Sequence, residues 1–258
     1  MQILIIGDVI GKPGRQTVQQ LLPGLRQQYH LDLVIANAEN AAGGLGLTAS
    51  TARELLQAGV DVLTSGNHIW DQKEIIPYLD GNLPILRPLN YPPGVPGQGY
   101  ITREHVAIVN VIGRTFMNNY DCPFRAMDNL LPRLRNNCTV VIVDFHAEAT
   151  SEKIALGRYL DGRVSAVVGT HTHVGTIDTR VFPKGTAHVT DVGMTGPVES
   201  VIGDDVQVVI QRFLTVTPVR LTVSTDHKTI FNSVLVSVDD KSGQALAIER
   251  VDRETEIA

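Results

Sequence analysis

The segment Gln2-Ile3-Leu4-Ile5-Ile6-Gly7-Asp8 decides the fold, because it has the pattern of a buried strand that ends in a glycine and a carboxylate. Apolar runs of the same kind recur at Leu33–Ala36 and Val60–Thr64. Amphipathic helices are expected between these runs, over Gln16–Tyr29 and Thr48–Gln57. Strands that alternate with helices indicate parallel strands joined by right-handed crossovers. We therefore expect an α/β fold.

Length and composition favour a single globular domain over residues 1–258. The hydrophobic and charged fractions, 43% and 19%, are those of an ordered chain rather than a disordered one. The two cysteines, Cys122 and Cys138, are too few for a secreted-type disulfide framework and favour a reducing compartment. No signal peptide or membrane span is recognisable, so we expect a cytoplasmic protein.

The formal net charge of −5 argues against a basic face that binds duplex nucleic acid. It is compatible with a small phosphorylated substrate, whose charge a local cluster of cations would neutralise. A homo-oligomer is an open alternative, because β segments in the C-terminal half could pair between subunits.

The C-terminal part of the chain has a mainly β pattern from Ile177 onward. Strands are expected at Pro218–Ser224, Ile230–Val238 and Ala245–Val251, with one helix near Asp204–Phe213. The polar tail after Asp252 is expected to fray.

Metal-competent side chains follow one predicted strand after another. They are Asp8, Glu39, Asn40, Asn67, His68, His146, His171 and His173. Taken singly, each has a structural explanation, such as a turn, a helix cap or a near-core histidine. Taken together they do not, because parallel strands bring all of them to one edge of the sheet, and they include four of the eight histidines.

This set combines carboxylates, imidazoles and amide oxygens, without thiolates. Such a set favours Mn, Fe, Zn or similar cations over a cysteine-rich structural zinc site. It contains more ligands than one ion requires, so two ions are expected. Glu39 is the natural bridge between them, since one carboxylate can span cations about 3.5–4 Å apart.

Short motifs in this chain follow the order found in calcineurin-like metallophosphoesterases. They are Gly7-Asp8, Asn37-Ala38-Glu39-Asn40, Gly66-Asn67-His68, His146 and Gly169-Thr170-His171-Thr172-His173. More narrowly, Gly7–Gly14 and Thr190–Gly196 resemble motifs of the bacterial YmdB-like branch, and the resemblance covers nearly the whole chain. The resemblance implies a four-layer α/β/β/α sandwich, a dinuclear metal centre and phosphodiesterase activity toward cyclic nucleotides, including 2′,3′-cyclic ones.

The same resemblance implies a role for each motif residue. Asp8, Glu39, Asn40 and His173 would hold the first metal, and Glu39, Asn67, His146 and His171 the second. His68 would be the proton donor, with a positioning role next to a ligand as the alternative. The chain departs from the broader superfamily in having Val9 and Ile10 after Asp8 instead of Asp-x-His, and Glu39 instead of an aspartate.

We therefore predict a metal-dependent phosphodiesterase of small phosphate diesters, such as 2′,3′-cyclic AMP. A metal-bound hydroxide would attack phosphorus and a histidine would act as general acid. The cofactor would be two divalent or mixed-valence transition-metal ions, with Fe or Mn favoured over Zn. Two alternatives stay open: a phosphomonoesterase or nucleotidase with the same centre, and a metal-bearing nucleotide sensor with negligible turnover.

Overall fold

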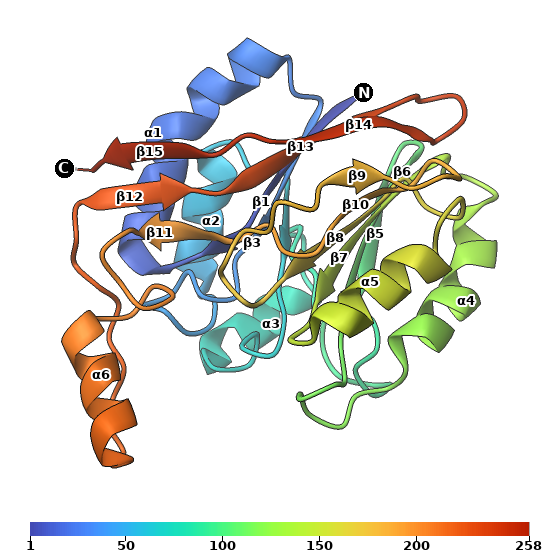
Figure 1. The fold of residues 1–258 in the computed structure, drawn as a ribbon. Coiled ribbons are helices and arrows are strands. Elements are labelled where there is room, and N and C mark those ends of the chain that lie inside the picture. Colours follow the sequence, from blue (N-terminus) through green and yellow to red (C-terminus); the bar gives the residue numbers. More distant parts are fainter. Residues whose placement is uncertain (258) are drawn as a thin grey trace.

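Two sheets packed face to face form the centre of the molecule in the computed structural model, which describes residues 1–257 (Figure 1). The first sheet has the order β14 (Ala245–Arg250), β13 (Ser233–Val238), β1 (Gln2–Ile6), β3 (Leu33–Asn37), β4 (Val62–Thr64). The second has the order β5 (Tyr100–Arg103), β6 (Val106–Ile112), β7 (Val140–His146), β8 (Ala166–Thr170), β10 (Ala187–Val189), β9 (Arg180–Val181). A smaller third sheet has the order β15 (Arg253–Glu256), β12 (Lys228–Phe231), β11 (Met194–Pro197), β2 (Asp8–Val9).

Helices cover the outer faces of both main sheets. On the first sheet lie α1 (Gly11–Tyr29) and α2 (Ala49–Gln57), and on the second lie α4 (Pro123–Leu134) and α5 (Thr150–Tyr159). The short elements η1 (Lys73–Ile75) and α3 (Ile76–Leu79) follow β4, and α6 (Val206–Thr215) projects from the body (Figure 1). The predicted α/β/β/α sandwich is therefore confirmed.

Strand β1 shows how the sequence builds these layers. Ile3 and Ile5 pack in the apolar core between the two main sheets. Leu4 and Ile6 face the opposite way and pack in the core beneath α1 and α2. Successive side chains of a strand point to opposite faces, so a strand buried on both faces must be apolar throughout. All four side chains are at most 1% exposed, which explains the unbroken run in the sequence.

The parallel strands bring their carboxyl ends to the same side of the sandwich. In the first sheet β1, β3 and β4 are parallel, and in the second β6, β7, β8 and β10 are parallel. The chain leaves β1 through Gly7, where an added Cβ would lie 1.8 Å from the carbonyl oxygen of Gly193. Only glycine fits this close approach, which places Asp8 beside β11.

Several predictions about individual elements were wrong. Helix α1 begins at Gly11 rather than Gln16, since Pro13 falls in the first turn, where no backbone N–H is needed. Pro218–Ser224 forms no strand, and the expected strand Ile230–Val238 is divided into β12 and β13, which lie in different sheets. The tail after Asp252 is ordered as β15 and pairs with β12. Within residues 1–257, no helix has the length and apolar character needed to span a bilayer.

Candidate metal centre

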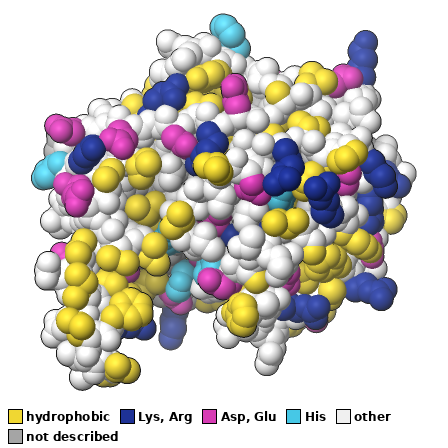
Figure 2. Space-filling model, viewed as in Figure 1, with side chains coloured by type: hydrophobic (Ala, Val, Ile, Leu, Met, Phe, Trp, Pro, Cys, Tyr) yellow, Lys and Arg dark blue, Asp and Glu magenta, His cyan; other side chains and the backbone are white. Residues whose placement is uncertain are grey.

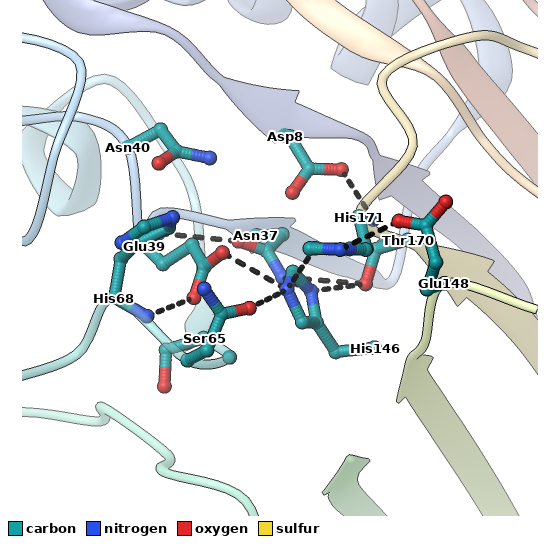
Figure 3. A network of polar contacts seen from close by, with 12 residues as sticks. Asp8, Asn37, Glu39, Asn40, Ser65, His68, His146, Glu148, Thr170 and His171 are labelled. Carbon is teal, nitrogen blue, oxygen red and sulfur yellow. Dashed lines mark hydrogen bonds and ion pairs between the residues drawn. The ribbon is translucent and has the colours of Figure 1, made fainter. Parts of the chain in front are cut away.

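The predicted site residues meet at the carboxyl ends of the parallel strands (Figure 3). Five of them line a cleft of about 520 Å³: Glu39, Asn40, His68, His171 and His173. Asp8 forms β2, Glu39 and Asn40 follow β3, Asn67 and His68 follow β4, His146 ends β7, and His171 and His173 follow β8. Figure 2 shows histidine and acidic side chains in this hollow, beside the lobe formed by α6. The structure therefore places all eight residues close together.

Three of these side chains offer ligand atoms that lie within 4.8 Å of one another: Glu39, His146 and His171. Nε2 of His146 lies 2.9 Å from Oε1 of Glu39, 3.0 Å from Nδ1 of His171 and 3.1 Å from Oδ1 of Asn67. One ring nitrogen has at most one proton, so it cannot satisfy three neighbours that each carry a lone pair. Lone pairs that converge in this way fit a cation.

A second group of side chains lies on the other side of Glu39. Nε2 of His173 is 3.8 Å from Oδ1 of Asp8 and 3.2 Å from Nδ2 of Asn40. Rotation of the Asn40 amide by 180° would present its oxygen, which is the atom that binds cations. Asp8, Asn40 and His173 therefore supply one carboxylate, one amide and one imidazole to this side.

Two buried carboxylate oxygens lack hydrogen-bond donors among residues 1–257. Oδ1 of Asp8 has none, and Oε1 of Glu39 is near Nε2 of His146 but in a direction that makes no hydrogen bond. Both side chains are at most 1% exposed, so these oxygens are also withheld from water. An unpaired buried carboxylate is costly unless a cation neutralises it. The donor set therefore fits bound metal cations, as the resemblance in sequence implies.

The ring of His146 is held in one orientation through Nδ1, the nitrogen that faces away from the cluster. Its Nδ1 lies 3.0 Å from the hydroxyl of Thr170, and that hydroxyl donates a 2.8 Å hydrogen bond to Oδ1 of Asp144. With the hydroxyl proton used in this way, the His146 Nδ1–H donates to Thr170 and Nε2 points at the cluster. An added Cβ on Gly66 would lie 2.1 Å from this ring, so the residue before Asn67 must be glycine. Partners of this kind fix the geometry of metal-binding histidines.

His171 and His173 are held in left-handed backbone conformations, with φ of 102° and 65°. This backbone is not extended, so the rule that alternate side chains of a strand point the same way does not apply to the two rings. Between them, Thr172 donates hydrogen bonds from its backbone N–H (3.1 Å) and its hydroxyl (2.8 Å) to Oδ2 of Asp191. This carboxylate holds the loop in a conformation that would otherwise be unfavourable.

His68 lines the cleft beside the two groups of ligands. Its backbone N–H donates to Oε2 of Glu39 at 2.9 Å, and its Nδ1 lies 2.7 Å from Oδ2 of Asp71. Nε2 is then the ring atom that remains for a substrate. Asp71 does not cap the following 3₁₀ helix η1, which begins at Lys73 and has no side-chain cap.

Two further carboxylates were not predicted to belong to the site. Asp71 pairs with His68, and Oε2 of Glu148 lies 3.0 Å from Nε2 of His171. Asp71 follows His68 by three residues, a spacing that could have suggested the pair. Nothing in the local sequence indicates that Glu148 would reach His171.

Burial and neighbouring charges shift the pKa values of the clustered side chains in opposite directions. Burial raises the pKa of Asp8. Burial would also raise that of Glu39, but His146 and His68 outweigh it and lower the pKa to about 2. Burial disfavours the His146 cation, yet Glu39, Asp8 and Asp144 raise its pKa to about 9, so a metal ion that binds Nε2 must displace a proton from it. Burial and the neighbouring His146 lower the pKa of His171 to about 3. Glu39 is therefore an anion and His171 a neutral ligand at neutral pH.

Comparison with known proteins gives concordant matches along the chain. The family model described as YmdB-like protein matches residues 4–251. A 2′,3′-cyclic-nucleotide 2′-phosphodiesterase of Bacillus subtilis (strain 168) is 48% identical over 255 residues, which are 97% of this chain and 96% of that protein.

Two solved structures have the same fold. A hypothetical protein from Thermus thermophilus superposes with a TM-score of 0.91 at 47% identity, covering 98% of this chain and 99% of the other. A structure described as a novel phosphatase, from Mycoplasma pneumoniae, has a TM-score of 0.93 at 35% identity, covering 100% and 94%. The resemblance therefore extends over the whole sandwich.

Proposed function

Because this chain belongs to the YmdB-like family, we propose that it is a dinuclear-metal phosphodiesterase that hydrolyses small phosphate diesters, including 2′,3′-cyclic AMP. The observation that carries this proposal is the convergence of buried, unpaired ligand atoms around Glu39 at the floor of an open cleft. The substrate class comes from the relative's activity, and the ligand geometry of this chain supports metal-dependent hydrolysis of a phosphate ester.

The ligands divide into two sets that share one residue. The first metal would be held by Asp8, Glu39, Asn40 and His173, and the second by Glu39, Asn67, His146 and His171. Nitrogen and oxygen donors without thiolates favour Fe or Mn and also allow Zn. When bound, the metals neutralise charge on the phosphoryl oxygens and lower the pKa of water in the cleft.

His68 would complete the reaction. Hydrolysis of a diester forms a new phosphorus–oxygen bond to water and breaks the one to an alkoxide, which is a strong base. Protonated His68 would give its proton to that departing oxygen, and Asp71 would keep the ring oriented through Nδ1. The backbone bond from His68 to Glu39 ties the acid to the bridging ligand.

We also propose a cytoplasmic enzyme, for which Cys122 and Cys138, both free thiols, are suited.

The experiment that tests the function combines metal analysis with turnover. Purified protein would be analysed for bound Fe, Mn and Zn and assayed with 2′,3′-cyclic AMP, bis-p-nitrophenyl phosphate and p-nitrophenyl phosphate, before and after chelation. We expect about two metal ions per chain, and diester hydrolysis that chelation abolishes and Mn or Fe restores. A preference for the monoester would instead indicate a phosphatase. Tight nucleotide binding without turnover after metal loading would indicate a sensor.

A further inference from the structure

A second cavity adjoins the metal centre on the side away from α6. It has a volume of about 260 Å³ and is lined by Asn67 and His171 together with Phe116, Met117, Asn118 and Tyr120. The last four belong to the loop between β6 and α4, the light-green loop at the lower edge of Figure 1. A molecule in this cavity would touch two of the proposed ligands of the second metal and this loop at the same time.

Phe116 occupies an unfavourable position in this loop. Its residue surface is 88% exposed, so the aromatic ring gains little from burial. Its φ is 63°, in the left-handed region that a bulky residue rarely adopts. Neither feature stabilises the fold, which points to a ligand that covers the ring.

The loop holds Phe116 in a defined place because both of its ends are fastened. On one side, the carboxylate of Glu152 accepts hydrogen bonds from the backbone N–H groups of Arg114 (3.1 Å) and Thr115 (3.0 Å). On the other, the buried amide of Asn90 donates to the carbonyl oxygens of Ile112 and Asp121, both at 2.8 Å. The loop tip is thus built to present a side chain rather than to move freely.

The floor of the cavity is also rigid. Tyr120 packs edge-on against Tyr91, with ring centroids 5.0 Å apart, and Tyr91 packs in the same way against Trp70. Next to this aromatic stack, the exposed amide of Asn118 donates one hydrogen bond to the hydroxyl of Tyr120 at 3.4 Å. Its oxygen and its second N–H remain for a ligand. An exposed ring, an aromatic floor and these two amide groups together suit a flat heterocycle with polar edges.

We propose that this cavity is the nucleobase subsite of the enzyme and that Phe116 stacks on the base. The inference rests on the proposed function, because the phosphate must lie at the metals for the base to reach Phe116. Stacking on one aromatic face accepts any base, so the subsite would favour nucleotides over other diesters without selecting strongly among bases. The main alternative is that the base lies in the larger cleft, near Leu45.

The test compares two substrates in three variants of the metal-loaded enzyme. The substrates are 2′,3′-cyclic AMP and its abasic analogue, methyl β-D-ribofuranoside 2,3-cyclic phosphate. We expect Phe116→Ala to lower kcat/KM for the nucleotide about ten-fold, mainly through KM, and to leave the abasic analogue unchanged. Phe116→Trp should restore kcat/KM for the nucleotide. The control Leu45→Ala, in the other cavity, should leave kcat/KM unchanged for both substrates.

Three outcomes would overturn the subsite. In one, Phe116→Ala lowers kcat/KM equally for both substrates. In another, it changes kcat/KM for neither substrate. In the third, Leu45→Ala lowers kcat/KM for the nucleotide alone, which places the base in the larger cleft.

Failure of the catalytic proposal is a separate result, in which the wild type hydrolyses neither substrate. Calorimetric titration with 3′-AMP then decides the subsite on its own. A weaker affinity in Phe116→Ala than in the wild type supports it, and equal affinities reject it.

Discussion

Nζ of Lys153 lies 2.6 Å from Oδ2 of Asp191, and both side chains are only 1% exposed. The same carboxylate oxygen accepts both hydrogen bonds from Thr172, and the other oxygen accepts one from the backbone N–H of Gly193 at 2.8 Å. The carbonyl of Gly193 in turn accepts from the backbone N–H of Asp8. Asp191 thus links a helix to the loops that carry ligands of both proposed metal sets.

We expect the removal of either partner of this ion pair to destabilise the protein. Asp191→Asn would leave the Lys153 ammonium buried without a counter-charge, at a cost of about 3–5 kcal/mol of unfolding free energy. Lys153→Met should cost less, because Asp191 keeps its donors in Thr172 and Gly193. The double variant should lose less than the sum of the two, because it leaves no charge unpaired. Urea denaturation checks these values, and strict additivity would show that the two charges are not coupled.

The sequence predicted those site residues whose place in the structure follows from their position next to a strand. Asp8, Glu39 and His146 were predictable because each lies at or directly after an apolar strand, and parallel strands share one edge. The left-handed backbone of His171 was not predictable, because it depends on Asp191, twenty residues further along the chain. The division of β12 from β13 at Asn232 was hidden for a related reason, since one apolar run supplies strands to two different sheets.

Glu39 should be the ligand whose loss removes both metals. Glu39→Gln keeps the shape of the side chain but removes the charge that both metal sets share, so metal content should fall well below one ion per chain. Asn67→Ala affects only the second set, and about one ion should remain. Elemental analysis of equally purified proteins gives the answer. Retention of two ions by Glu39→Gln would disprove the bridging role.

A pH dependence of stability should come from His188, away from the metal centre. The ring is 1% exposed, its Nδ1–H donates to the carbonyl of Val167 at 3.0 Å, and its buried Nε2 has no partner among residues 1–257. Burial lowers its pKa below the usual 6.5, and Arg180 and Arg158 contribute in the same direction.

The sign of the effect follows from where protons bind. Because the folded-state pKa of His188 is the lower one, the unfolded chain takes up a proton first as the pH falls. The contribution of neutral His188 to the unfolding free energy is therefore fully present above about pH 6.5. At more acidic pH it falls by up to about 1.4 kcal/mol per pH unit. Unfolding curves between pH 7.5 and 5 measure this slope. His188→Leu should flatten it even if its overall stability is lower, and an unchanged slope would assign the effect to other groups.

The role of His68 can be separated from that of a positioning residue by the leaving group. If His68 protonates the departing oxygen, His68→Ala should lower kcat by about 10²–10⁴-fold for 2′,3′-cyclic AMP, whose leaving group is a basic alkoxide. The loss should be much smaller for bis-p-nitrophenyl phosphate, because p-nitrophenolate leaves without a proton.

Asp71→Asn should show the same selectivity to a lesser degree, since Asp71 acts only by holding Nδ1 of His68. Glu74→Gln, at an exposed carboxylate on η1, is the matched control and should change neither substrate. Metal content should be unchanged in all three variants. Equal losses for both substrates would mean that the His68 ring has a positioning role in the cleft and donates no proton to the leaving group. A loss of kcat for 2′,3′-cyclic AMP alone, with both metals retained, would identify the His68 ring as the general acid. The buried metal ligands cannot supply this proton themselves.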